Sequence, residues 1–281
     1  MLLFGVDFTS APSPRKPIVV AAGTVKAKRL RVDSLTALTS HERFRAFLQS
    51  PGPWVGGFDF PFGLSRRFIE TAQLPPAWRD YAGELCGLPR AGFIARLKAY
   101  RATRAPGDKE HRRPTDRIAG SVSPQKLENP PVGLMFYEGI RALLESGATI
   151  VPMHAGDPTK IALEAYPGAL GRRLIGRAPY KSDDRSKQSP ERDEARRELL
   201  KRVQSRDCRK LHGLTLDLPK PLARELQADK LGDKIDAVLC LIQAAWALGE
   251  KHYGVPADAE PSEGWIIAAD KYLEPLRSER R

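Results

Sequence analysis

The sequence contains few cysteines and no long apolar run, and each shortage narrows the classes of protein that it can encode. Its three cysteines, Cys86, Cys208 and Cys240, show no paired spacing and no histidine-rich neighbourhood, so we expect reduced, mostly structural thiols. No apolar run is long enough to span a bilayer, which argues against a membrane partner. The first residues reach an acid at Asp7 and lack the basic leader of a signal peptide, so we expect a cytoplasmic protein.

Internal repeats and low-complexity tracts are also missing, which leaves an ordinary globular chain with an excess of positive charge. Its 281 residues are enough for one large domain with a sizeable core, or for two small domains. Lysine and arginine number 46 against 34 acids, for a formal net charge of +12. This excess suggests an anionic partner, and nucleic acid is the first candidate.

The positive charge is concentrated in two segments. Residues 90–128 contain ten basic residues against four acids, and residues 170–212 contain fourteen against seven. The alternative to an anion-binding surface is a pair of solvated, charged helices. Acids and bases alternate between residues 190 and 202, and this pattern favours the alternative for that segment.

The first sixty residues predict a small mixed sheet. The patterns follow the order strand 2–8, strand 17–22, strand 25–32, helix 39–48 and strand 54–60. Gly23 and Thr24 are expected to form the turn between the second and third strands. Short connections predict an antiparallel meander for the first three strands. The helix then crosses over and places the fourth strand parallel to the first.

The rest of the chain predicts one α/β domain over residues 1–281 with two basic helical insertions, at about 64–128 and 168–228. Between and after the insertions, we expect a helix at 132–147, strands at 148–151 and 160–166, a helix at 230–248 and a last edge strand at 263–269.

The helix at 230–248 is apolar on nearly every face, yet it contains Asp233 and Asp236. Residues three apart lie on one face of a helix, so both carboxylates are expected on the same side of one turn. A buried carboxylate is costly unless it is paired, hydrogen-bonded or bound to a metal. Asp233 has a simpler alternative as the cap of the helix N-terminus after Gly232.

Three further acids lie at or near the ends of predicted strands: Asp7, Asp59 and Glu164. If the first and fourth strands are parallel neighbours, Asp7 and Asp59 lie side by side at the edge where open α/β sheets bind ligands. The helix at 230–248 could bring Asp236, and with it Asp233, to this edge. Oxygen ligands favour Mg²⁺ or Mn²⁺, and two such ions would suit phosphodiester chemistry. Taken singly, Asp7 and Asp59 could cap turns, and Glu164 could face solvent.

The sequence resembles domain-of-unknown-function family 429, whose members are predicted nucleases with a ribonuclease H-like fold. The matching pieces are Gly-Val-Asp-Phe at 5–8, Gly-Phe-Asp-Phe-Pro-Phe-Gly-Leu at 57–64, Arg-Pro-Thr-Asp-Arg at 113–117, Glu-Ala-Tyr-Pro at 164–167, Tyr-Lys at 180–181, Asp-Lys-Ile-Asp-Ala at 233–237 and Glu-Gly-Trp-Ile at 263–266. The resemblance implies a ribonuclease H-like core with a metal-dependent phosphodiesterase site. Asp7, Asp59 and Asp236 would be metal ligands, and Asp233 or Glu164 would complete the set.

Arg113, Asp116 and Lys181 lie in the basic segments next to turn-forming residues. Arginine and lysine can hold a phosphate, so these residues are candidates for substrate binding. Arg113 and Asp116 could instead pair with each other across a turn. Thr9 and Ser10 are candidates as well, since Asp-Phe-Thr-Ser at 7–10 could form a phosphate loop.

The leading hypothesis is therefore a Mg²⁺- or Mn²⁺-dependent nuclease acting on DNA or RNA. A second hypothesis is a phosphotransferase or ATPase of the actin-like and sugar kinase superfamily. That hypothesis requires a glycine-rich nucleotide loop late in the chain, where glycine is sparse. A third is a basic nucleic-acid-binding protein without catalysis, in which the carboxylates only cap turns and helices.

Overall fold

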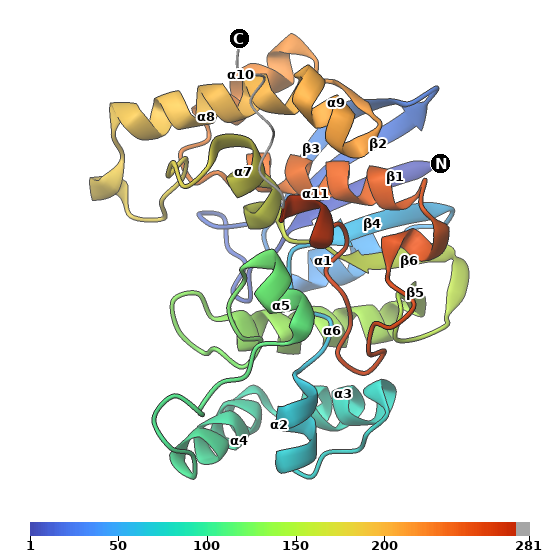
Figure 1. Ribbon diagram of the computed structural model, residues 1–281, viewed down its shortest axis with the longest axis vertical. Helices are drawn as coiled ribbons and strands as arrows, with labels where there is room; N and C mark the ends of the chain where they lie inside the picture. Colours follow the sequence, from blue (N-terminus) through green and yellow to red (C-terminus); the bar gives the residue numbers. More distant parts are fainter. Residues whose placement is uncertain (274–281) are drawn as a thin grey trace.

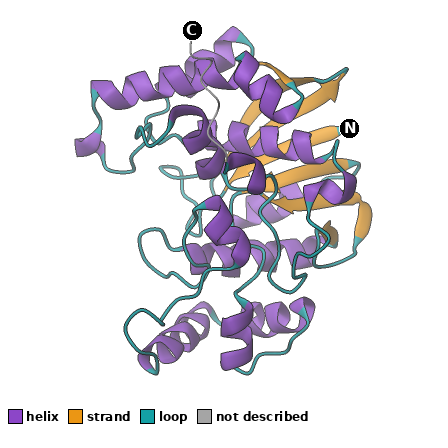
Figure 2. Cartoon of the chain, in the orientation of Figure 1, coloured by secondary structure: helices purple, strands orange, loops and turns teal. Residues whose placement is uncertain are grey.

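A computed structural model describes residues 1–273 of the chain. Its strands form one sheet in the order β5-β6-β4-β1-β2-β3-β7 (Figures 1 and 2). The strands are β1 (Leu2–Asp7), β2 (Ile18–Lys26), β3 (Arg29–Leu38), β4 (Trp54–Phe58), β5 (Ala148–Ile150), β6 (Asp157–Glu164) and β7 (Thr215–Asp217). β1, β2 and β3 form an antiparallel meander, and the other pairs are parallel. The predicted mixed sheet is confirmed, and it is consistent with a ribonuclease H-like fold.

Helices cover both faces of the sheet. They are α1 (His41–Leu48), α2 (Arg66–Thr71), α3 (Trp78–Gly87), α4 (Arg90–Ala102), α5 (Pro114–Ala119), α6 (Val132–Ser146), α7 (Pro167–Ile175), α8 (Pro190–Val203), α9 (Arg206–His212), α10 (Lys220–Ala228) and α11 (Asp233–Ala247). Short 3-10 turns lie at Arg185–Lys187, Lys251–Gly254 and Asp270–Tyr272. One core cluster joins the sheet to α1, α3, α4 and α6, and a second joins the other face to α7–α11.

Alternation along the strands decides which side chains meet which core. In β1, Leu3 packs in the cluster that contains α11, whereas Phe4 and Val6 pack in the opposite cluster. Successive side chains of a strand point to opposite faces, so Asp7 shares the face of Leu3. In β4, Val55 packs on the α11 side. Asp59 follows it by an even number of residues, so it faces the same side.

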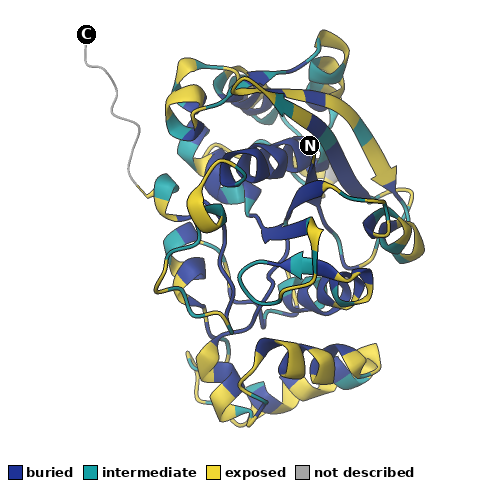
Figure 3. Cartoon of the chain, turned by 90° about the vertical axis from the view of Figure 1, so that its right-hand side faces the viewer, coloured by how far each residue is buried: buried dark blue, intermediate teal, exposed yellow. Residues whose placement is uncertain are grey.

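Helix α11 crosses directly over β1 and is buried along nearly its whole length (Figure 3). Gly5 makes this close approach possible, because a Cβ atom there would lie 2.0 Å from the Ala237 carbonyl oxygen. Gly57 in β4 plays the same part against Cys240, with a Cβ-to-oxygen distance of 2.7 Å. The two glycines therefore set the depth at which α11 lies over the carboxyl ends of β1 and β4.

Two local predictions are wrong. The turn between β2 and β3 lies at Ala27 and Lys28, which have positive φ, and not at Gly23 and Thr24. Gly23 instead lies inside β2 at a shift of register, where a Cβ would meet a backbone carbonyl of β3 at 2.4 Å. The expected edge strand at 263–269 is only an isolated bridge between Ile266 and Glu164.

The structure also contains a strand that the sequence patterns did not predict. Three residues at 215–217 form β7, which extends the sheet beyond β3 inside a segment that was expected to be helical. Among the expected helices of this segment, α8, α9 and α10 pack together, at the top of Figure 1.

Candidate active site

Asp7 and Asp59 lie next to each other at the carboxyl edge of the sheet. β1 and β4 are adjacent and parallel, with Val6 opposite Phe58, and the Asp59 amide donates to the Val6 carbonyl at 2.9 Å. Asp7 is the last residue of β1 and Asp59 directly follows β4, so both side chains emerge on the α11 side. The neighbouring parallel strands that the sequence predicts for these two acids are present.

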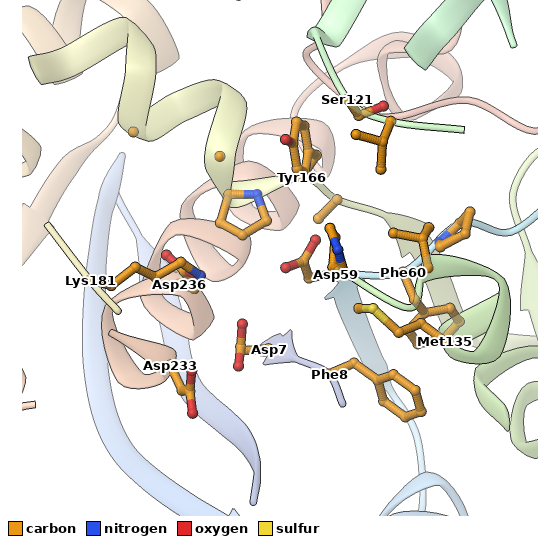
Figure 4. Close-up of a pocket in the computed structure, with 18 of the residues that line it drawn as sticks. Asp7, Phe8, Asp59, Phe60, Ser121, Met135, Tyr166, Lys181, Asp233 and Asp236 are labelled. Carbon is orange, nitrogen blue, oxygen red and sulfur yellow. The ribbon is translucent and has the colours of Figure 1, made fainter. Parts of the chain in front are cut away.

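The first turn of α11 brings two more carboxylates to this edge. Gly232 precedes the helix in the left-handed conformation, and Asp233 is the first helical residue. Gly232 holds the N-cap position and Asp233 lies one residue inside the helix, so the alternative role of Asp233 as the N-cap is wrong. Its side chain is buried, and its Oδ2 atom has no hydrogen-bond partner within the described residues 1–273. Figure 4 shows Asp7, Asp59, Asp233 and Asp236 around one end of a pocket.

Asp236 is held by two neighbours from the loop before α8. The Tyr180 hydroxyl donates to Asp236 Oδ1 at 2.5 Å, and the Lys181 ammonium donates to Oδ2. Arg196 and Arg192 anchor this loop by donating to the backbone carbonyls of Tyr180 and Lys181, respectively. Asp236 is therefore a paired group inside the acidic cluster, and Lys181 is the cation that contacts it.

Burial, together with the neighbouring carboxylates, raises the pKa values of Asp7, Asp59 and Asp233. Burial raises the pKa of Asp7 well above its usual range, although Lys181 opposes the change. Burial and the neighbouring Asp236 raise the pKa of Asp59 to about 8. Burial raises the pKa of Asp233 to about 6, against the influence of Lys16 and Lys181. Burial opposes the charge of Lys181, but the Asp236 carboxylate raises the pKa of Lys181 well above its usual value.

The chemistry of the cluster fits a hard divalent cation. Its donors are all carboxylate oxygens, and one buried oxygen, Asp233 Oδ2, has no hydrogen-bond partner within residues 1–273. The side chains are not closed around an ion, however. Among residues 1–273, no group of three or more His, Cys, Asp or Glu side chains has the arrangement of a metal-binding site. The ammonium of Lys181 lies against Asp236, where it supplies part of the missing positive charge.

Glu164 is bonded within a second buried network, although it is close enough to Asp59 to contribute to the raised pKa of that acid. Ala162 packs on the face opposite α11, and Glu164 has the same parity along β6. Arg113 donates to both Glu164 oxygens, at 2.8 and 2.5 Å, and to Asp116 Oδ1 at 2.7 Å. The Phe62 amide also donates to Glu164, at 2.9 Å. Burial raises the pKa of Glu164, and the guanidinium of Arg113 opposes that change.

The pairing of Arg113 with Asp116, which the sequence left as an alternative, is confirmed. Arg113 is 1% exposed, and its guanidinium is surrounded by carboxylates of the protein. The roles of Arg113 and Asp116 in substrate binding, and of Glu164 in catalysis, stay predictions. In this structure the three side chains are already bonded to one another.

A cavity of about 1020 Å³ opens beside the acidic cluster. Thr9 and Ser10 line it shortly after Asp7, and Lys16, Arg172 and Arg177 add positive charge to its wall. Phe60, Val122, Val132 and Met135 contribute apolar surface. One cavity therefore joins the four carboxylates to a basic and apolar wall.

Residues 5–261 of the chain match the family described as Protein of unknown function (DUF429). The chain belongs to the DUF429 family. The matched region contains the four clustered carboxylates, and the family resemblance drawn from the sequence pieces is confirmed. No curated protein and no solved structure matches the chain. Across residues 1–273 of this DUF429 protein, the helices are too short or too polar to cross a membrane.

Several residues around the cavity of this DUF429 protein were not singled out from the sequence. Tyr180 was part of a matching piece, but its hydrogen bond to Asp236 spans 56 positions and has no local signal. Arg172 lies within the basic segment 170–212, and Tyr166 lies two residues after Glu164. The only sequence signal for Arg172 and Tyr166 was therefore that they lie near predicted features, and many other residues share that property.

Proposed function

We propose that this DUF429 protein is a nuclease that hydrolyses phosphodiester bonds of nucleic acid with Mg²⁺ or Mn²⁺. One observation carries the proposal: Asp7, Asp59, Asp233 and Asp236 gather at the carboxyl edge of the sheet, and a buried oxygen of Asp233 has no hydrogen-bond partner within residues 1–273. Carboxylates at close range repel one another unless protons or cations neutralise them. A site built from such groups on rigid elements is suited to divalent ions.

The four carboxylates would hold the metal, which would stabilise charge at the phosphate and lower the pKa of a bound water. β1, β4 and α11 orient these groups, and the glycine contacts between strands and helix keep them in place. Lys181 neutralises Asp236 in the metal-free protein. With a cation held by the carboxylates, the Lys181 ammonium would be available to contact a phosphate oxygen of the substrate.

The charge of the chain supports a polyanionic substrate. The formal net charge is +12, and Lys16, Arg172 and Arg177 line the same cavity as the carboxylates. Basic side chains at the mouth of an acidic site offset the repulsion between the carboxylates and the substrate phosphates. A cytoplasmic location belongs to the same proposal, supported by three buried cysteines that are free thiols within residues 1–273.

Metal binding and cleavage test the proposal together. Titration calorimetry with Mn²⁺ should show binding to the wild type, and end-labelled DNA and RNA should be cut only when Mg²⁺ or Mn²⁺ is present. Asp236→Asn should lower the cleavage rate about 100-fold or more, because it removes charge from the ion site. Asp258→Asn is a matched control at an exposed position outside the cavity lining and should leave both measurements unchanged.

Other results would redirect the assignment. Metal-independent binding of nucleic acid without cleavage would favour the non-catalytic binding protein. ATP hydrolysis without cleavage of either nucleic acid would favour the phosphotransferase hypothesis. Equal losses in Asp236→Asn and Asp258→Asn would contradict the role of the carboxylate cluster.

A further inference from the structure

The cavity extends well beyond the space that a metal ion and one phosphate group need. Its volume of about 1020 Å³ lies just above the range, about 300–1,000 Å³, that is usual for pockets which bury an organic ligand. The carboxylates occupy one side. In Figure 4, Phe60 and Met135 lie on the opposite side of Asp59 from Asp233 and Lys181. The second side of the cavity therefore needs an occupant of its own.

The second side is apolar and firmly packed. Phe60 is buried, and its ring contacts Phe8 and Phe62 at centroid distances of 4.7 and 5.3 Å. Met135 and Val132 come from the first turn of α6 and are partly exposed in the cavity. Val122 lines the cavity and is 37% exposed, which is high for a large apolar side chain. A flat apolar group would remove this surface from water.

Tyr166 and Arg172 add an aromatic and a guanidinium plane to the cavity wall. The Arg172 guanidinium carbon lies 5.3 Å from the centre of the Tyr166 ring, and Arg172 also donates to the Ala119 carbonyl at 2.5 Å. The backbone of Tyr166 exchanges two hydrogen bonds with the Gln243 side chain of α11, at 3.1 and 3.2 Å. The Tyr166 backbone is therefore hydrogen-bonded to the same helix that carries Asp233 and Asp236.

These features match a nucleobase better than other apolar groups. A base has a flat π face for stacking on aromatic and guanidinium planes, and it is covalently linked to the phosphate that the carboxylate side would receive. The cationic residues Lys16, Arg172 and Arg177 line the same cavity and suit the phosphates on either side of that base.

We propose that the second side of the cavity, between its apolar residues and the Tyr166 ring, receives one unpaired nucleobase. The substrate is therefore a single strand or a locally unpaired strand. The inference rests on the nuclease function proposed above. A base inside a duplex has its Watson–Crick edge and both faces covered, and it can enter a concave site only after it leaves the stack. Fully paired duplex is therefore the poor substrate, and a strand with a free base beside the scissile phosphate is the good one.

Binding without turnover tests this inference separately from catalysis. One oligonucleotide sequence is prepared as a single strand, as a full duplex and as a single strand with abasic positions, and its affinity is measured by fluorescence anisotropy with Ca²⁺ in place of Mg²⁺. We expect the single strand to bind at least about tenfold more tightly than the abasic strand, since stacking on an aromatic side chain is a large part of such affinities. The duplex should bind more weakly than the intact single strand.

Two substitutions at one position isolate the stacking surface. Tyr166→Leu keeps an apolar side chain but removes the ring, and it should reduce the preference for the intact strand over the abasic strand to near unity. Tyr166→Phe keeps the ring and should retain the preference. If Tyr166→Leu does not fold, Val122→Asn provides a second test, because it polarises an exposed apolar part of the cavity lining without adding charge. It should weaken binding of the intact strand but not of the abasic strand.

The outcomes separate the two proposals. Equal binding of all three nucleic acids, or a strand preference that survives in both Tyr166→Leu and Val122→Asn, would overturn the nucleobase site while leaving metal-dependent cleavage standing. If the wild-type protein neither binds Mn²⁺ nor cleaves nucleic acid, but still shows a strand preference that depends on Tyr166, the nuclease proposal is overturned and the base-binding cavity is retained.

Discussion

The ammonium of Lys181 donates to Asp236 across 55 positions of sequence, and the two residues differ sharply in exposure. The side chain of Asp236 is 1% exposed, whereas that of Lys181 is 41% exposed. The acid is therefore a fixed part of the core, while the base approaches it from a loop at the surface. We therefore expect that Lys181 can be replaced without loss of the buried helix α11, and this asymmetry leads to the first prediction.

Lys181→Gln should destabilise the metal-free protein and improve metal binding. Removing one partner of a fully buried pair costs about 3–5 kcal/mol, and the exposure of Lys181 should reduce this to about 1–3 kcal/mol. A competing positive charge also disappears, so the dissociation constant for Mn²⁺ should fall. Thermal unfolding and titration calorimetry measure the two effects. A variant that is destabilised but binds Mn²⁺ more weakly would mean that Lys181 supports the ion rather than competing with it.

Asp233→Asn should have the opposite effect on the metal-free protein. The Oδ2 atom of Asp233 lacks a hydrogen-bond partner within residues 1–273, and its carboxylate adds to the repulsion among the acids. Neutralising it should leave the melting temperature unchanged or raise it, while affinity for Mn²⁺ falls about 10- to 100-fold. Asp258→Asn again serves as the exposed control. Unchanged Mn²⁺ affinity would remove Asp233 from the proposed ligands.

The metal-free protein should lose stability as pH rises from about 4 to about 8. The pKa of Asp59 is raised from 3.8 to about 8, and the pKa of Asp233 is raised to about 6. In this window the folded state binds more protons than the unfolded state, so the free energy of unfolding decreases with increasing pH. The contribution is complete below the unfolded pKa and is lost as pH passes through the folded pKa.

Melting curves at pH 5 and pH 8 with a chelator measure this effect, and Asp59→Asn should reduce the difference between them. Adding Mn²⁺ should reverse the trend, because the ion binds the deprotonated carboxylates. At 100 times its dissociation constant, it should stabilise the folded protein by about 2.7 kcal/mol. A pH dependence that Asp59→Asn does not change would contradict the raised pKa of Asp59.

Arg113→Met should destabilise the protein by about 3–5 kcal/mol, because it leaves Glu164 and Asp116 buried without their cation. The double variant Arg113→Met with Glu164→Gln should recover part of this loss. Urea denaturation measures both changes. Mn²⁺ affinity of the folded variants should stay close to that of the wild type. A large loss of affinity in Glu164→Gln would instead restore Glu164 as a metal ligand.

The sequence predicted the carboxyl edge of the sheet well, because that edge depends on local patterns. The apolar run before Asp7 and the run before Asp59 each end at a turn, and a single crossing helix makes their strands parallel. The apolar pattern of residues 230–248 likewise required a buried helix with two acids on one face. These features need only alternation, periodicity and connection length.

Long-range partners could not be predicted in the same way. Glu164 lies at the end of a strand like Asp7 and Asp59, but its parity directs it to Arg113, which is 51 positions away. The contact between Lys181 and Asp236 depends on how the loop before α8 packs against Gly232. β7 is only three residues long and exists because β3 offers it a free edge, so its own sequence contains little signal.

The close contact between Gly5 and α11 has a consequence for the timing of local opening. A helix that touches the central strand at backbone distance cannot separate from it without exposing much of the core, so the amides of Ala237 to Leu241 should exchange with deuterium only through global unfolding. The loop carrying Tyr180 and Lys181 should exchange much faster. Asp233 and Asp236 would thus stay in place on α11 during local opening, while the Lys181 ammonium that neutralises Asp236 dissociates and rebinds.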